Sequence, residues 1–272
     1  MNTPHPLPLL RHAFSALVCV TSLGLASHLH AQTTTITTAT GDGADTWVGR
    51  TTGGDDNFGT ATSVQIRAPG ASDERLTYLR FDLGSVVPAN ITAPSLTLVA
   101  ASNITATFTL YGLVNATTAD ALSTSGGWSE TGLIFNTAPA RTGTSGITMA
   151  TTSSAQAGDP TSYAVQIGTF DLSSITAGTS ITLGTGLTNA TQSVGLTSGL
   201  LSFLQADTNR DVTFVLTTGT TVGGTFQIYS KEFSSAVNAP ALSFSTVPEP
   251  STYALVTSGL MMGVALLRRR RS

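Results

Sequence analysis

The amino-acid sequence predicts an all-β protein, a single β-sandwich or jelly roll of about ten short strands. Short runs of alternating apolar and polar residues recur between residues 33 and 246, the period-2 pattern of strands with one buried face. Glycine, proline, asparagine and aspartate separate these runs. No helical repeat of useful length competes with them, so strands dominate the expected fold.

The first half of this region contains the clearest strand patterns. Residues 33–40 are rich in threonine, whose β-branched side chain favours extended backbone. In Leu76–Leu83, the residues Leu79 and Phe81 point to one face while Tyr78 and Arg80 point to the other, as in a half-buried strand. Further strands are expected at Ser63–Arg67, Leu96–Val99 and Phe108–Tyr111.

The second half is expected to add more strands to the same core. They lie around Ile134–Phe135 and at Tyr163–Ile167, Ser180–Leu183, Asp211–Leu216, Thr225–Tyr229 and Ala241–Phe244. One short helix is expected at Gly199–Ala206, with Leu200, Leu201 and Leu204 on one face and Ser198 as its N-cap. The long polar stretch Gly143–Thr161 is expected to be an exposed loop.

The N-terminus, residues 1–31, has the pattern of a secretory signal peptide. Arg11 and His12 precede an apolar run at 13–26, and cleavage is expected after Ala31. The single cysteine, Cys19, lies in this run, so the mature protein has no disulfide and no thiol chemistry. The mature body then spans residues 32–246, enough for one large all-β domain.

The C-terminus, residues 247–272, has three parts in a fixed order. Pro248, Glu249 and Pro250 come first, followed by sixteen residues without charge at 252–267. Four arginines, Arg268, Arg269, Arg270 and Arg271, follow. The uncharged run makes a helix of about 24 Å, and local thinning of the roughly 30 Å membrane core lets it span. The arginines are expected to stay on the cytoplasmic side.

This order resembles the PEP-CTERM sorting signal. The resemblance implies that a membrane exosortase recognises and cleaves the chain near Pro248-Glu249-Pro250 after the secretion machinery has exported it. The protein would be anchored in the inner membrane before processing, and would then reach the cell surface or extracellular matrix. A plain C-terminal membrane anchor is the alternative interpretation.

Composition excludes several function classes. Residues 32–246 hold seven basic and fourteen acidic residues, a formal net charge of −7, which argues against nucleic acid and anionic lipid as partners. All four histidines (His5, His12, His28 and His30) belong to the signal peptide. The mature body therefore lacks histidine-based catalysis and the commonest zinc ligand.

Carboxylates are the remaining candidates for catalysis. Glu130 and Glu232 could form the pair that glycoside cleavage requires. The structural alternative is that Glu130 orders the loop after Trp128 and Glu232 pairs with an arginine such as Arg80. We favour this alternative, and the sequence predicts that the protein is not an enzyme.

An acidic cluster lies near the start of the body. Asp42, Asp45, Asp55, Asp56 and Asn57 fall within sixteen residues and are interspersed with glycines. Flexible, oxygen-rich loops suit Ca²⁺, although this spacing does not match an EF-hand. The same residue types also form ordinary turns. The sequence thus requires no cofactor, and Ca²⁺ is the one candidate.

The two tryptophans are the candidate sugar-binding residues. Trp47 and Trp128 offer flat aromatic faces that can stack on the apolar face of a pyranose ring. The alternative is that both lie buried in the core.

Several short motifs of the body come in a familiar order. They are Trp47-Val48, Asn57-Phe58-Gly59, Tyr78–Leu83, Trp128-Ser129-Glu130, Phe135-Asn136 with Ala138-Pro139, and Ser230-Lys231-Glu232 with Pro240-Ala241-Leu242. Together they resemble the DNRLRE-type domain, a jelly-roll module of secreted bacterial proteins related to a carbohydrate-binding module family. Phe135 replaces the usual tryptophan and Thr137 the second asparagine. The resemblance implies a jelly roll and makes glycan binding a function to test.

Three functions follow from these observations. The first is an exported, exosortase-sorted protein of the cell envelope or matrix, without catalytic activity and with exopolysaccharide as its candidate ligand. The second is a stand-alone, calcium-stabilised carbohydrate-binding module. The third is a polysaccharide lyase or hydrolase.

Overall fold

The structure is a computed structural model of the whole chain. It describes residues 31–50, 56–67, 74–114, 128–142, 148–149, 164–192, 196–218 and 224–247, together with residue 259. Residues Thr33–Thr246 form one compact unit. The expected signal peptide and transmembrane helix lie almost entirely outside the described residues. Among the residues described, no helix combines the length and apolar character needed to cross a membrane.

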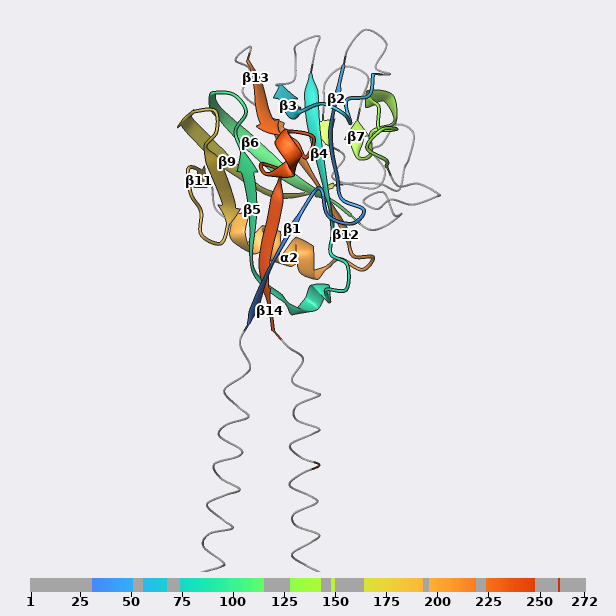
Figure 1. The fold of residues 1–272 in the computed structure, drawn as a ribbon, viewed down its shortest axis with the longest axis vertical. Coiled ribbons are helices and arrows are strands. Elements are labelled where there is room, and N and C mark those ends of the chain that lie inside the picture. The colour runs from blue at the N-terminus through green and yellow to red at the C-terminus, as the bar shows by residue number, and fades with distance from the viewer. Residues whose placement is uncertain are drawn as a thin grey trace, which may run out of the picture. The chain divides into compact units, whose positions relative to one another are not determined.

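The body is a β-sandwich, as the sequence predicts, and Figure 1 shows the smaller sheet in front of the larger one. The smaller sheet has the order β1 (Gln32–Thr37), β14 (Ala241–Thr246), β5 (Ile91–Val99) and β10 (Ser180–Gly184). The larger sheet has the order β11 (Thr191–Gln192), β9 (Ala164–Ile175), β6 (Ile104–Leu113), β12 (Asp211–Thr218), β4 (Arg75–Asp82), β3 (Ser63–Arg67) and β13 (Thr225–Tyr229).

Several shorter elements complete the fold. They are β2 (Ala44–Gly49), which pairs with β4, a small ladder of β7 (Arg141–Thr142) and β8 (Thr148–Met149), α2 (Leu196–Gln205), and the 3-10 turns η1 (Pro88–Asn90), η3 (Phe135–Thr137) and η4 (Ser234–Ala236). The strand pairs with a defined register are antiparallel, for example β12 with β4 and β14 with β5.

The main core fills the space between the two sheets. Leu98 and Phe244 from the smaller sheet pack in one cluster with Phe81, Phe108 and residues around them from the larger sheet. The rings of Phe108 and Phe170 stack with their centroids 5.5 Å apart. Helix α2 adds Leu196, Leu200 and Leu204 to this cluster.

A second core lies on the opposite face of the larger sheet. Leu76 and Tyr78 of β4 are buried there against Trp128 and Phe135, which belong to a covering segment, residues 128–140. The expectation of a half-buried strand at Leu76–Leu83 is therefore wrong. A period-2 pattern marks Tyr78 as amphipathic, but only the covering segment decides that its side chain is buried.

Most expected strands are confirmed, and the errors have local causes. Ile134–Phe135 does not form a strand, because η3 occupies Phe135–Thr137. The helix begins earlier than expected, at Leu196, so Ser198 lies within it and is not its N-cap. Leu201, expected on the buried face, is only partly buried. Strand β2 was not expected, since its aspartate and glycine residues are typical of turns. Most of Gly143–Thr161 lies outside the described residues.

Candidate functional site

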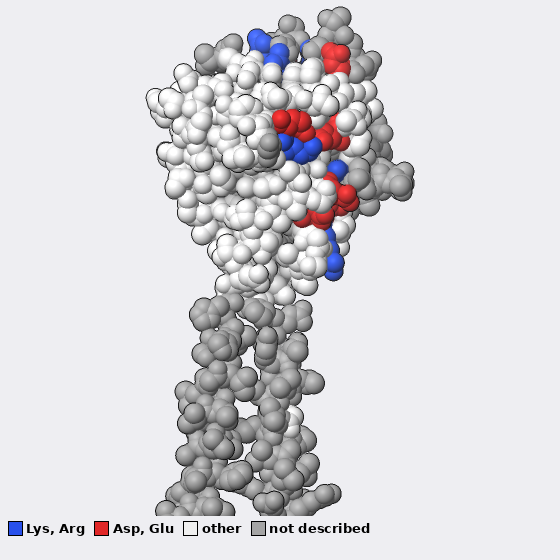
Figure 2. Space-filling view, viewed as in Figure 1, with Lys and Arg blue, Asp and Glu red and all other residues white. Residues whose placement is uncertain are grey.

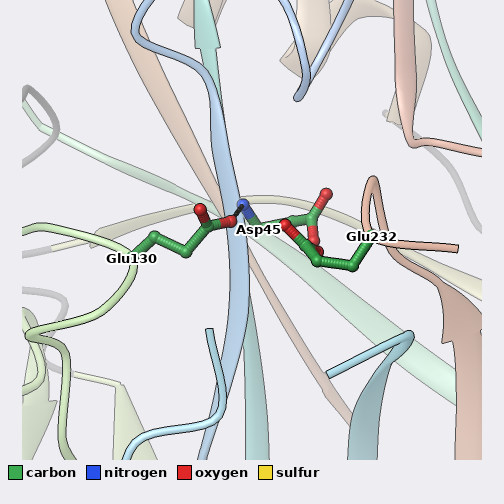
Figure 3. A group of neighbouring side chains, drawn as sticks. All are labelled: Asp45, Glu130 and Glu232. Atoms are coloured by element: carbon green, nitrogen blue, oxygen red, sulfur yellow. Dashed lines mark hydrogen bonds between the residues drawn. The ribbon is translucent and has the colours of Figure 1, made fainter. Parts of the chain in front are cut away.

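Three acidic side chains from distant parts of the chain meet at one place, which we call the carboxylate cluster. Asp45 lies in β2, Glu130 in the covering segment, and Glu232 in the turn after β13 (Figure 3). One carboxylate oxygen from each residue lies within 4.8 Å of the other two. Asp45 is 1 % exposed, while the side chains of Glu130 and Glu232 are partly exposed.

Lys231 and main-chain amides hold the carboxylate cluster together. The Lys231 Nζ lies 2.7 Å from Glu130 Oε2 and 2.6 Å from Glu232 Oε1. The Lys231 N–H donates a hydrogen bond to Asp45 Oδ2 at 3.0 Å, and Thr38 Oγ1 donates to the same oxygen. The Asp45 N–H in turn donates to Glu130 Oε1 at 2.9 Å. The cluster thereby joins β2, the covering segment and the turn after β13.

Burial controls the protonation of Asp45. Loss of solvent raises the pKa of its carboxyl group to about 7, and the negative charges of Glu232 and Glu130 act in the same direction. Hydrogen bonds from Thr38 and Lys231 oppose this rise. For Lys231, burial acts to lower the pKa, but its bonds to Glu130 and Glu232 outweigh burial and raise it above the ordinary value. The ammonium therefore stays charged, while Asp45 titrates near neutral pH.

Two oxygens of the carboxylate cluster are buried without a hydrogen-bond partner: Asp45 Oδ1 and Glu232 Oε2. Figure 3 shows the carboxylates of Asp45 and Glu232 turned toward one another, while Glu130 approaches the main chain of Asp45 from the other side. The set offers carboxylate oxygens and no nitrogen or sulfur. Such donors suit a proton or a hard cation such as Ca²⁺.

The described residues of the expected calcium site are not gathered in one group of acidic side chains. Of these, only Asp45 belongs to the carboxylate cluster, and it lies in a strand where it is paired with Leu79. Asp42 and Asp56 are exposed. Asp55 lies outside the described residues.

Asn57, the fifth expected ligand, fastens the covering segment instead. Its Nδ2 donates to the main-chain oxygens of Glu130 at 2.8 Å and Leu133 at 2.7 Å. Its Oδ1 accepts a hydrogen bond from the Gly59 N–H at 3.1 Å. The side chain is thus occupied in holding the backbone next to Glu130.

The two tryptophans expected to stack on sugars lie in the core. Trp47 is 4 % exposed and stacks on Phe58 with ring centroids 3.5 Å apart. Trp128 is also 4 % exposed, and its Nε1 donates to Thr213 Oγ1 at 3.1 Å. Neither ring presents an exposed face on which a pyranose could stack, so these two tryptophans do not form a sugar-binding surface in this fold.

Sequence reasoning singled out both glutamates but gave Glu232 the wrong partner. Glu232 pairs with Lys231, whereas Arg80 donates to the main-chain oxygens of Asp42 and Trp128. The sequence held one signal that could have pointed to these two residues together. Glu130 and Glu232 are each the last residue of a motif that resembles the DNRLRE-type domain.

A separate hollow of about 470 Å³ lies where β6 begins, β9 ends and β13 begins. Its apolar part consists of Ile104, Ile175 and Phe226. Asn103, Thr105, Ser174 and Thr176 add amide and hydroxyl groups, and none of its lining residues carries a charge. A small apolar surface next to uncharged polar groups is typical of sites for neutral ligands.

Comparison with known families identifies both parts of the chain. The model of carbohydrate-binding module family 96 matches residues 36–198, from β1 into α2. The PEP-CTERM protein-sorting motif matches residues 246–271. No curated protein matches the chain. Both resemblances seen in the sequence are confirmed, and they indicate an exported, exosortase-sorted protein with a carbohydrate-binding body. The chain belongs to carbohydrate-binding module family 96 and carries a PEP-CTERM sorting motif at its C-terminus.

Proposed function

We propose that this protein is a non-catalytic component of the cell envelope or extracellular matrix that binds the exopolysaccharide around its own cell. One observation carries the proposal: the sorting motif begins at residue 246, where the last strand of the carbohydrate-binding body ends. The module that binds and the signal that exports are thus one continuous chain. Sorting would deliver the module to the place where secreted polysaccharide accumulates.

Among the residues that the structure describes, the hollow at the ends of β6 and β9 is a surface that can take a sugar. Asn103, Thr105 and Thr176 are exposed there and offer amide and hydroxyl groups that can bond sugar hydroxyls, while Ile104 and Phe226 also line the hollow but are buried. Figure 2 shows charged side chains at the top, in the middle and on the right of the face in view, and a largely uncharged left part. The absence of charge in the hollow favours a neutral polysaccharide over an acidic one.

The geometry of Glu130 and Glu232 supports a binding role over catalysis. Glu130 accepts a hydrogen bond from the Asp45 N–H on Oε1 and contacts Lys231 Nζ through Oε2. Glu232 Oε1 contacts the same ammonium. A general acid must be able to deliver a proton to the substrate, and neither oxygen of Glu130 is available for this.

A polysaccharide array tests the proposal. The body, residues 32–246, should bind a neutral polysaccharide saturably and release no new reducing ends or unsaturated products. Thr176→Arg places a long cation at the hollow and should weaken binding at least about tenfold. The control is Thr60→Arg, a change at an exposed threonine outside the hollow, which should bind as the parent does.

Three results would contradict parts of this proposal. A folded sample that binds no polysaccharide, the host's own included, would refute carbohydrate binding as its function. Equal binding by Thr176→Arg and the parent would place the sugar on another surface. Cleavage products that accumulate with purified protein would overturn the non-catalytic assignment.

A further inference from the structure

We infer that the carboxylate cluster of Asp45, Glu130 and Glu232 is a binding site for one divalent cation, Ca²⁺ in preference to Mg²⁺, and that Lys231 competes with the cation for these carboxylates. The inference concerns a different surface from the hollow and does not depend on the proposed sugar ligand. It rests on the spacing of the oxygens, on two buried oxygens without partners, and on the charge balance.

The spacing of the three carboxylates fits a single ion. One oxygen from each of Asp45, Glu130 and Glu232 lies within 4.8 Å of the others. Two ligands on opposite sides of a Ca²⁺ ion lie about 5 Å apart, since each Ca–O distance is about 2.3–2.6 Å. All three oxygens can therefore contact the same ion without a large rearrangement of β2 or of the two turns.

The partnerless oxygens point to a ligand between two of these residues. Asp45 Oδ1 and Glu232 Oε2 are buried and have no hydrogen-bond partner. Asp45 as a whole is only 1 % exposed. The carboxylates of Asp45 and Glu232 face one another (Figure 3). Two buried acceptors that face each other are unfavourable unless something positive lies between them. A proton shared between the two oxygens would join only Asp45 and Glu232. A cation can coordinate both of these residues and Glu130 as well.

The charges leave room for a divalent ion. Three carboxylates face one ammonium, so the fully ionised group carries an excess of two negative charges. Lys231 Nζ contacts Glu130 and Glu232, while the Asp45 carboxylate meets Lys231 through its main-chain N–H. A monovalent ammonium thus leaves Asp45 without a full counter-charge. A divalent cation would balance the excess, and the flexible Lys231 side chain can move toward solvent.

The donor set and its placement select the ion. The mature body has no histidine or cysteine, so softer metals lack their preferred ligands here. Two of the three carboxylates come from turns, an irregular arrangement that Ca²⁺ tolerates and the strictly octahedral Mg²⁺ does not. A bound ion would connect β2, the covering segment and the turn after β13, and would therefore stabilise the fold.

Protonation would oppose the cation. The ionisable groups that face Asp45 are Glu130 from the covering segment and Lys231 and Glu232 from the turn after β13. A carboxylate must lose its proton to bind a metal ion, so protons compete with the cation for all three residues.

Calorimetric titration with Ca²⁺ and with Mg²⁺ tests the inference. The full chain, in mild detergent and stripped with chelator, should bind one Ca²⁺ and unfold at a higher temperature in its presence, with a much smaller effect of Mg²⁺. Asp45→Asn and Glu232→Gln should each weaken Ca²⁺ binding at least about tenfold, because each removes a charged ligand. Lys231→Met should bind Ca²⁺ more tightly than the parent. Asp171→Asn, at an exposed aspartate outside the cluster, is the matched control.

The opposite results overturn the inference. No heat and no thermal shift with Ca²⁺ in the folded parent would show that Lys231 is the only cation the cluster holds. Binding that persists in both Glu232→Gln and Asp45→Asn would place Ca²⁺ elsewhere. Glu232 is partly exposed, so Glu232→Gln is expected to fold even where Asp45→Asn does not.

Discussion

Arg80 places its guanidinium 4.7 Å from the ring centroid of Trp128 and donates from Nη1 to the main-chain oxygen of the same residue at 2.5 Å. Its Nε also donates to the main-chain oxygen of Asp42 at 2.8 Å. Arg80 is 2 % exposed, so these contacts form inside the protein. A residue that alternation assigns to the solvent face thus fastens the covering segment, residues 128–140, to β4.

Arg80→Lys is expected to destabilise the protein by about 2–3 kcal/mol, since lysine keeps the charge but loses the planar fork that reaches two carbonyl oxygens. Urea unfolding measures the free energy. The control, Arg210→Lys at an exposed arginine, should change it by less than about 0.5 kcal/mol. Similar losses in both variants would contradict a role for the Arg80 contacts.

Tyr78→Phe tests the second attachment of the covering segment. The Tyr78 hydroxyl donates to the main-chain oxygen of Pro139 at 2.8 Å in a buried position. Removing the hydroxyl takes a hydrogen bond from the buried Pro139 oxygen. We therefore expect the free energy of unfolding in urea to decrease by about 1–2 kcal/mol. Tyr111→Phe, at a half-buried tyrosine packed against the same core, is the control and should lose less. An unchanged midpoint for Tyr78→Phe would contradict the attachment.

Gly199→Ala tests how closely α2 approaches the larger sheet. Alanine normally stabilises a helix relative to glycine by about 1 kcal/mol. Here a Cβ would lie 2.3 Å from the main-chain oxygen of Ile167, so the helix must move away from β9. We expect a net loss of about 1–3 kcal/mol in thermal or urea unfolding. Gly224→Ala, where a Cβ meets nothing closer than 3.8 Å, should be nearly neutral, and stabilisation by Gly199→Ala would refute the close approach.

Asp45→Asn should change how stability depends on pH in the presence of chelator. Burial raises the pKa of Asp45 from 3.8 to about 7, so the folded state holds a proton that the unfolded state releases. Stability due to this group therefore falls as pH rises between these values, by at most about 1.4 kcal/mol per pH unit. Asparagine cannot ionise, so the variant loses this part of the slope. Asp211, whose pKa burial raises to about 6, leaves a similar slope in both proteins.

Urea unfolding at about pH 4.5 and pH 7.5 measures this difference. The free energy of unfolding of Asp45→Asn minus that of the parent should increase from the lower to the higher pH, because only the parent loses the stability that the Asp45 proton provides. Asp171→Asn, at an exposed carboxylate, serves as the control. A difference between Asp45→Asn and the parent that is the same at both pH values would show that Asp45 does not titrate in this range.

Replacement of Pro248, Glu249 and Pro250 by alanine should block processing. The sorting motif matches residues 246–271, and the proposed cleavage lies near this tripeptide. In a host with exosortase, the triple variant should accumulate as a longer chain in the inner-membrane fraction, as measured by mass spectrometry after fractionation. Ser251→Ala, immediately outside the tripeptide, should be processed normally. Unchanged processing of the triple variant would refute cleavage directed by this motif.

The sequence by itself determined the fold class, the position of most strands and the C-terminal sorting motif. These features depend on neighbours along the chain: alternation sets the faces of Phe226 and Ile228 in β13, and the order of Pro248-Glu249-Pro250 and the arginines marks the signal. The confinement of all histidines to residues 1–31 likewise follows from the sequence alone.

Only the tertiary structure decided which faces are covered and which side chains meet. Tyr78 and Arg80 look half-exposed in the sequence because alternation cannot show that a segment from residues 128–140 packs on them. Asp45 lies 85 residues from Glu130 and 186 from Lys231, and strand pairing and turns bring them together. Local patterns fix what each segment can form, but contacts between distant segments depend on how the sheets pack. The carboxylate cluster is a product of that packing.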